Sequence, residues 1–111
     1  MTTQEVSSLI ASIGIPYAYY QFDEDTARPT PFICFYYPEE VEFIADNINY
    51  IKLMVLRIEL YTDEKDFTLE NRIESLLIEN ELPFTHYESY IDSEKMLMQT
   101  YETEVYINGR D

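Results

Sequence analysis

The sequence predicts an α+β fold, with a mostly antiparallel sheet of four to five strands and two helices packed on one face. Two stretches carry apolar residues at helical spacing, whereas other stretches alternate apolar and polar residues as strands do. Most connections between the expected strands are hairpin-like, and hairpins join antiparallel neighbours. Residues 1–111 are expected to form a single domain, because 46% hydrophobic residues can supply one core.

The first helix is predicted at the start of the chain. The string Thr2-Thr3-Gln4-Glu5 has the spacing of a capping box, in which Thr2 and Glu5 each bind the other's backbone N–H. Gly14 and Pro16 are expected to end this helix. Its apolar face consists of Val6, Leu9, Ile10 and Ile13.

The second helix is predicted between two strand-like stretches. Asp63 is expected to cap it, Asp66 to lie in its first turn, and the helix to end near Asn80. Its apolar residues recur every three or four positions, which gives it one face for the core. These residues are Leu69, Ile73, Leu76 and Leu77.

Five stretches are predicted to be strands because they are rich in aromatic and β-branched residues. Pro38 is expected to end the second of them. The mixed segment that follows is predicted to be a protruding arm over about 38–50, and the charged segment 23–31 an exposed loop. The predicted strands are 17–22, 32–37, 51–62, 84–91 and 97–107.

The alternation in two of these strands predicts an acidic, tyrosine-rich sheet face. In 51–62, Met54, Leu56, Ile58 and Leu60 share one face, and Arg57, Glu59 and Tyr61 share the other. If the last strand is a neighbour, its Glu102, Glu104 and Tyr106 join the second face. Like charges opposite one another on a sheet cost stability. Two interpretations stay open: an ordinary solvated face, or an oligomer interface or acidic channel wall that uses the repulsion.

The charge and the motifs argue against several classes of function. A net charge of −15 repels nucleic acids and anionic membranes. We expect no enzyme activity, no cofactor and no metal site. His86, the one histidine, is interpreted as a plain strand residue, and Cys34, the one cysteine, as a buried small hydrophobe. No stretch is apolar over the roughly 20 residues that a membrane helix needs.

Four strings resemble a family of small prophage proteins from Gram-positive bacteria. Such proteins are encoded among the head–tail connection and tail genes of long-tailed phages. Within that group the chain is similar to tail completion proteins, also called tail terminators, over nearly its whole length. The four strings are Pro31-Phe32-Ile33-Cys34-Phe35-Tyr36-Tyr37, Ala45-Asp46-Asn47-Ile48-Asn49-Tyr50, Ile58-Glu59-Leu60-Tyr61-Thr62-Asp63-Glu64-Lys65-Asp66-Phe67 and Tyr90-Ile91-Asp92-Ser93-Glu94-Lys95-Met96.

The resemblance implies a structural virion protein of the tail or neck, made in the bacterial cytoplasm. Its subunits would form a ring, usually a hexamer, that caps the tail tube and contacts the tube protein and the head connector proteins. DNA would pass through the ring without being bound, and no membrane would be involved. The candidate interface residues are Tyr36, Tyr37, Phe43, Ile44 and Tyr50, and the candidate acidic lumen residues are Glu59, Glu102 and Glu104.

Other functions remain open on the sequence. A small protein with a charge of −15 could be a DNA mimic that inhibits a nucleic-acid-binding host protein. The chain could also be a tail assembly chaperone or a tube subunit. A mimic should carry a continuous acidic stripe, whereas a ring subunit should concentrate its acidic residues on one inward surface.

Overall fold

The computed structural model describes residues 1–21, 29–45 and 50–108. Most of the loop predicted over 23–31, and residues 46–49 of the predicted arm, lie outside the described residues. The described residues form two helices and five strands. In chain order these are α1 (Thr3–Ala11), β1 (Tyr17–Tyr19), β2 (Phe32–Ala45), β3 (Tyr50–Thr62), α2 (Phe67–Glu79), β4 (Phe84–Ile91) and β5 (Met96–Asn108).

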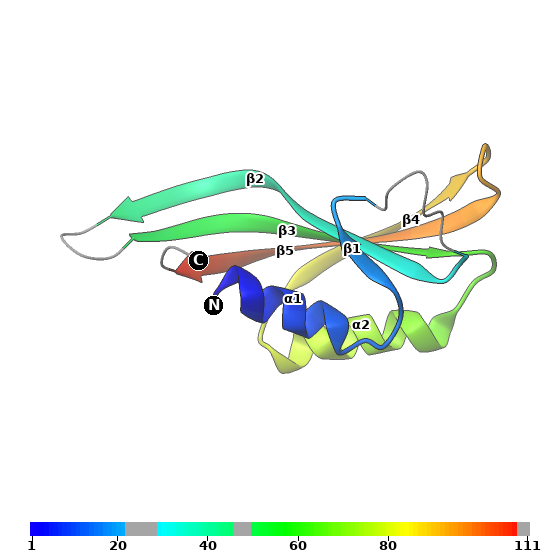
Figure 1. The fold of residues 1–111 in the computed structure, drawn as a ribbon, viewed down its shortest axis with the longest axis horizontal. Helices are drawn as coiled ribbons and strands as arrows, with labels where there is room; N and C mark the ends of the chain where they lie inside the picture. The colour runs from blue at the N-terminus through cyan, green and yellow to red at the C-terminus, as the bar shows by residue number, and fades with distance from the viewer. Residues whose placement is uncertain (22–28, 46–49, 109–111) are drawn as a thin grey trace.

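The strands form one five-stranded sheet in the order β1-β2-β3-β5-β4 (Figure 1). The short β1 runs parallel to β2, and every other neighbouring pair is antiparallel. Helix α2 carries the chain from β3 across to the edge strand β4, and β5 then returns between the two. The predicted class, α+β with a mostly antiparallel sheet, is confirmed.

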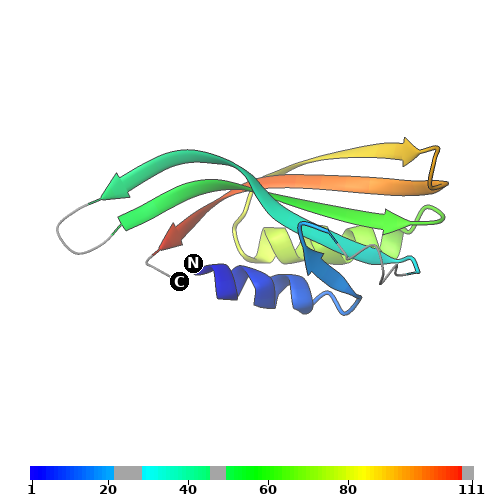
Figure 2. The same ribbon diagram turned by 45° about the horizontal axis from the view of Figure 1, so that its top comes forward.

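Both helices lie on the same side of the sheet, as predicted (Figure 2). We call this side the helix face and the opposite side the outer face. Alternate residues of the central strands point toward the helices, so the core lies between the helices and the sheet. The core residues are Val6, Ile10, Ile13, Ile33, Phe35, Leu56, Ile58, Leu60, Leu69, Ile73, Leu77, Tyr101, Val105 and Ile107.

The helix boundaries follow from local capping. The capping box is confirmed: the Glu5 N–H donates to Thr2 Oγ1, and the Thr2 N–H donates to Glu5 Oε1, both at 3.1 Å. The expectation that Asp63 caps the second helix is wrong. Asp66 is the N-cap, and its carboxylate accepts the Leu69 N–H at 3.0 Å. Asp66 satisfies a helix N–H three residues ahead, whereas Asp63 lies too far from the first turn to do so.

The expectation that Pro38 ends the second strand is also wrong, because β2 continues to Ala45. Pro38 lies where the register of β2 against β3 shifts, between Tyr36 and Glu39. A proline is tolerated within a sheet at such a bulge, where the ladder does not need its missing N–H. β1 is shorter than predicted and ends at Tyr19, before a residue with φ of +70°.

The molecule is elongated along the strands, with extents of 50 × 31 × 22 Å. β2 and β3 reach farther than the helices at one end of the sheet (Figure 1). We call this part the arm and define it as residues 39–45 of β2 paired with 50–55 of β3. The arm predicted over about 38–50 therefore consists of paired strands in its described residues, with a register shift between Glu40 and Glu42.

Candidate functional site

The outer face brings the three predicted lumen glutamates together. β3 and β5 are neighbours, so Glu59 on β3 lies on the same face as Glu102 and Glu104 on β5. Their cross-strand partners are Thr100, Arg57 and Val55, respectively. No two of the three are cross-strand partners, so these like charges do not lie directly opposite one another on the sheet.

Arg57 lies at the centre of the outer face and organises the charges around it. Its Nε donates to Glu102 Oε2 at 2.8 Å, and its Nη2 lies 2.7 Å from the same oxygen. Its Nη1 donates to the Tyr36 hydroxyl at 2.8 Å. The Tyr36 hydroxyl in turn donates to Glu59 at 3.2 Å, and the Tyr61 hydroxyl donates to Glu59 at 2.9 Å. One cation therefore links β2, β3 and β5 through charge-assisted hydrogen bonds.

This network raises the pKa values of its phenols and of its guanidinium. Burial raises the pKa of Tyr61, and the hydrogen bond to Glu59 adds to the effect. Burial also raises the pKa of Tyr36, against the opposing effect of Arg57. The hydrogen bonds to Tyr36 and Glu102 raise the pKa of Arg57 above its already high value. The phenols and the guanidinium thus stay protonated at neutral pH, and the network has a fixed donor pattern.

Exposed acidic residues of the outer face lie on the arm side of this network. Glu39 and Glu42 on β2 pair with Val55 and Leu53 across the ladder, so they share the face with Glu104. All three side chains are exposed. The outer face therefore has an acidic end near the arm and a partly neutralised centre at Arg57.

The five predicted interface residues do not form one patch. Tyr36 belongs to the Arg57 network, and Tyr37 packs against the core on the helix face. Phe43 and Tyr50 lie on the helix-face side of the arm, with ring centroids 5.4 Å apart. Ile44 pairs with Ile51, which places its side chain on the outer side of the arm. The arm thus exposes apolar groups on both of its sides.

A groove of about 650 Å³ opens on the outer face beside the arm. It is lined by Leu53, Val55 and Tyr106 from the sheet and by Leu82 and Pro83 from the connection between α2 and β4. Glu102 and Glu104 also line it. Sequence patterns do not predict this groove, because the α2–β4 connection is far from 53–55 in the chain and nothing in the local pattern places the two together.

Comparison of the chain with models of known protein families and with curated protein sequences finds no significant match to either.

The length and apolar character of α1 and α2 show whether either helix could cross a membrane. In the part of the chain that the structure describes, neither helix combines the length and the apolar character needed to cross a membrane.

Proposed function

We propose that the protein is a structural virion subunit of a long-tailed phage or prophage, and that it acts as the tail terminator. In this role several copies form a ring that caps the tail tube and joins it to the head connector. The proposal starts from the resemblance of four strand and turn strings to that family. It has additional support from three features of the surface: the arm, the groove and the distribution of acidic residues.

The arm is the observation that carries the proposal. Three apolar side chains of β2 are about half exposed there: Val41 at 45%, Phe43 at 51% and Ile44 at 46%. Exposed apolar groups gathered on a projecting element are typical of surfaces that become buried on assembly. A β-ladder also holds them rigidly, so little conformational entropy is lost when they bind.

The groove supplies a complementary surface on the same chain. Its lining includes the apolar side chains of Leu53, Val55, Leu82 and Pro83, so it can receive apolar groups of a neighbouring subunit. A contact between the exposed apolar residues of β2 in the arm (Val41, Phe43 and Ile44) and the groove of a neighbour joins two different surfaces, which makes it heterologous. Heterologous contacts that close on themselves form rings, and a ring is what a tail terminator requires.

The acidic end of the outer face is consistent with a ring lumen through which DNA passes without binding. Glu39, Glu42 and Glu104 present exposed carboxylates there, and like charges repel phosphates. A DNA mimic has less support, because Arg57 interrupts the acidic surface that such a protein would need.

The test is co-sedimentation of the purified protein with tail tubes assembled from the tube protein of the same phage. The proposal expects a fixed number of bound copies per tube, independent of tube length, because only an end is capped. Tubes sheared to half their length should therefore bind twice as many copies per mass of tube protein.

Three other outcomes would reject the proposal. Binding in proportion to tube mass would indicate a tube subunit. Binding to unassembled tube protein alone would indicate a chaperone. An absence of binding to either form, together with competition against DNA for a nucleic-acid-binding protein, would indicate a DNA mimic.

A further inference from the structure

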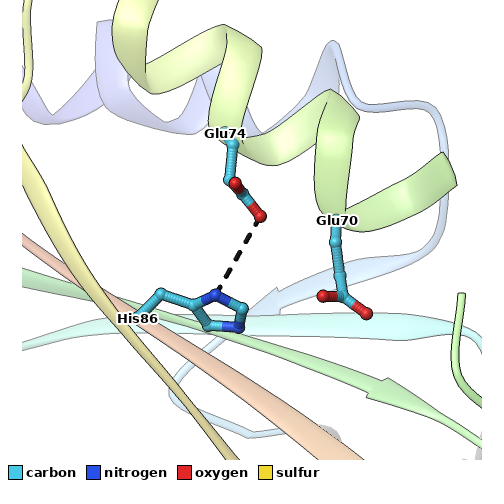
Figure 3. Close-up of side chains that lie close together, drawn as sticks. All are labelled: Glu70, Glu74 and His86. Atoms are coloured by element: carbon cyan, nitrogen blue, oxygen red, sulfur yellow. Dashed lines mark ion pairs between the residues drawn. The ribbon is translucent and has the colours of Figure 1, made fainter. Parts of the chain in front are cut away.

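We propose that Glu70, Glu74 and His86 form a binding site for one divalent first-row transition metal ion. The site lies on the helix face, between α2 and β4, and is separate from the arm, the groove and the Arg57 network (Figure 3). It does not depend on the proposed role in a phage tail.

The backbone brings three possible ligands to one point. Glu70 and Glu74 are four residues apart on α2, so their side chains extend from the same side of the helix. His86 pairs with Tyr101 in the ladder of β4 and β5, and Tyr101 belongs to the core, so the imidazole faces the helix. One ligand atom from each of the three lies within 4.8 Å of the others. Small side-chain rotations would bring these atoms to about 2 Å from a common metal ion.

The hydrogen bonds of His86 leave its Nδ1 directed toward the carboxylates. The Gln99 amide N–H donates to Glu88 Oε1 at 2.7 Å, which fixes the amide with its oxygen toward His86. His86 Nε2 lies 2.6 Å from that oxygen and must therefore be the protonated nitrogen. In the neutral ring Nδ1 then carries the lone pair, and it lies 4.0 Å from Glu74 Oε2. A metal-bound histidine normally donates its second ring N–H in this way.

Glu70 is a buried carboxylate with one unused oxygen. The residue is only 4% exposed. Its Oε1 accepts from Lys65 at 3.0 Å, whereas its Oε2 is buried and has no hydrogen-bond partner among the described residues. A buried polar atom without a partner costs free energy and calls for an explanation. A cation between Glu70, Glu74 and His86 would supply the missing partner.

The charges around the site also favour a cation. Glu70, Glu74 and Glu88 contribute three negative charges, and Lys65, which bridges Glu70 and Glu88, contributes one positive charge. With His86 neutral, the site has a net charge of −2. The Tyr101 hydroxyl donates to Glu74 Oε2 at 2.9 Å, and the Tyr101 ring stacks on His86 at 4.3 Å. These contacts hold two of the ligands in place, as outer partners do in metal sites.

The donor set indicates the class of metal. One imidazole nitrogen with two carboxylate oxygens suits Zn²⁺ and its first-row neighbours, whereas Mg²⁺ and Ca²⁺ prefer sites built from oxygen alone. Three protein ligands leave at least one position for water. The side chains of His86 and Glu74 are 27% and 32% exposed, so an ion can reach the site from solvent.

The experiment is titration of the metal-free protein with ZnCl₂ by isothermal calorimetry, and with CoCl₂ by visible absorption, at neutral pH. The expected result is one saturable Zn²⁺ site per chain, and a Co²⁺ spectrum typical of a site with a nitrogen ligand. His86→Gln and Glu74→Gln should each weaken Zn²⁺ binding at least about tenfold. Glu79→Gln is the matched control: it removes the same charge from α2 at an exposed position and should leave the affinity unchanged.

Circular dichroism first checks that each variant is folded. The wild-type titrations test the proposal even if a variant does not fold. The proposal is overturned if the wild-type protein shows no saturable Zn²⁺ binding. It is overturned equally if Glu79→Gln weakens binding as much as His86→Gln, or if a hundredfold excess of Mg²⁺ displaces the Zn²⁺. Either of the last two results would mean that Zn²⁺ is attracted by the overall negative charge of the protein and is not bound at this site.

Discussion

Arg57 and Glu102 face each other across β3 and β5, with the guanidinium 2.7–2.8 Å from one carboxylate oxygen. Both side chains are more than two-thirds buried, although they lie on the face that carries no described helix. The pair therefore stabilises the middle of an otherwise open face, on the opposite side of the sheet from the core.

We expect this pair to contribute measurably to stability. Arg57→Met keeps the aliphatic stem and removes the charge, and it should lower the free energy of unfolding by about 1–2 kcal/mol because Glu102 loses its cation. A double-mutant cycle with Glu102→Gln in urea should give a coupling energy of about 1 kcal/mol.

The pair of Lys52 and Glu40 in the arm is the matched comparison. Its charged atoms are 3.6 Å apart and its side chains are nearly half exposed. The cycle of Lys52→Met with Glu40→Gln should give a coupling energy below about 0.5 kcal/mol. Equal coupling at the two sites would mean that the Arg57 network adds no more than a surface ion pair.

The acidic surface is best tested at Glu104. Reversing Glu59, Glu102 and Glu104 together to lysine would place two new cations around Arg57, so a defect could come from misfolding. Glu104 is exposed and pairs with Val55, so Glu104→Lys should leave the unfolding free energy within about 0.5 kcal/mol of the wild type. In a phage we expect slower DNA ejection with normal tail length. Normal ejection kinetics would mean that Glu104 does not line the lumen.

The arm is expected to drive assembly without stabilising the subunit. Phe43→Asp and Ile44→Asp should each leave the circular dichroism spectrum unchanged and abolish binding to tail tubes, because both side chains are about half exposed. Ile78→Asp on α2 is the control, since Ile78 is exposed to 66% and lies outside the arm. Unfolding of Phe43→Asp would place that residue in the core, and loss of binding in Ile78→Asp would mean that the arm has no special role.

Tyr101 should make the protein sensitive to alkaline pH. Burial, and then the hydrogen bond to Glu74, raise the pKa of Tyr101 above the ordinary value of about 10. A group whose pKa is raised in the folded state contributes stability that is present below its unfolded-state pKa and is lost as the pH rises toward the folded-state pKa. Stability should therefore fall above about pH 10.

Tyr101→Phe isolates this effect. The variant should lose less stability than the wild type between about pH 9 and pH 11, measured by urea unfolding at each pH, because the ionisable hydroxyl is gone. Tyr90→Phe, at an exposed position, should follow the wild-type curve. The same loss in all three proteins would assign the alkaline transition to other groups.

The structural features that depend on local interactions were predicted correctly from the sequence. The capping box at Thr2 and Glu5, the bounds of β4 and the inward-facing residues of β3 all follow from interactions within a few residues, or from simple alternation. The prediction failed at Pro38, because continuation of β2 depends on pairing with β3 across a bulge, and that pairing is not local.

The candidate sites were harder to predict for the same reason. The alternation of β3 put Arg57 beside Glu59, but only the register of β5 shows that Glu102 is its partner. The spacing of Glu70 and Glu74 on one helix is visible in the sequence. The direction of His86 depends on which residue of β5 it pairs with, and interpreting it as a plain strand residue therefore overlooked its contacts with Gln99 and Glu74.

Electron microscopy of tail tubes mixed with the purified protein tests the central claim most directly. If the protein is a tail terminator that assembles through its arm, a ring of extra density should appear at one end of each tube with the wild-type protein, and should be absent with Ile44→Asp. Density along the whole tube, at both ends equally, or at no tube end with the wild-type protein would contradict that account.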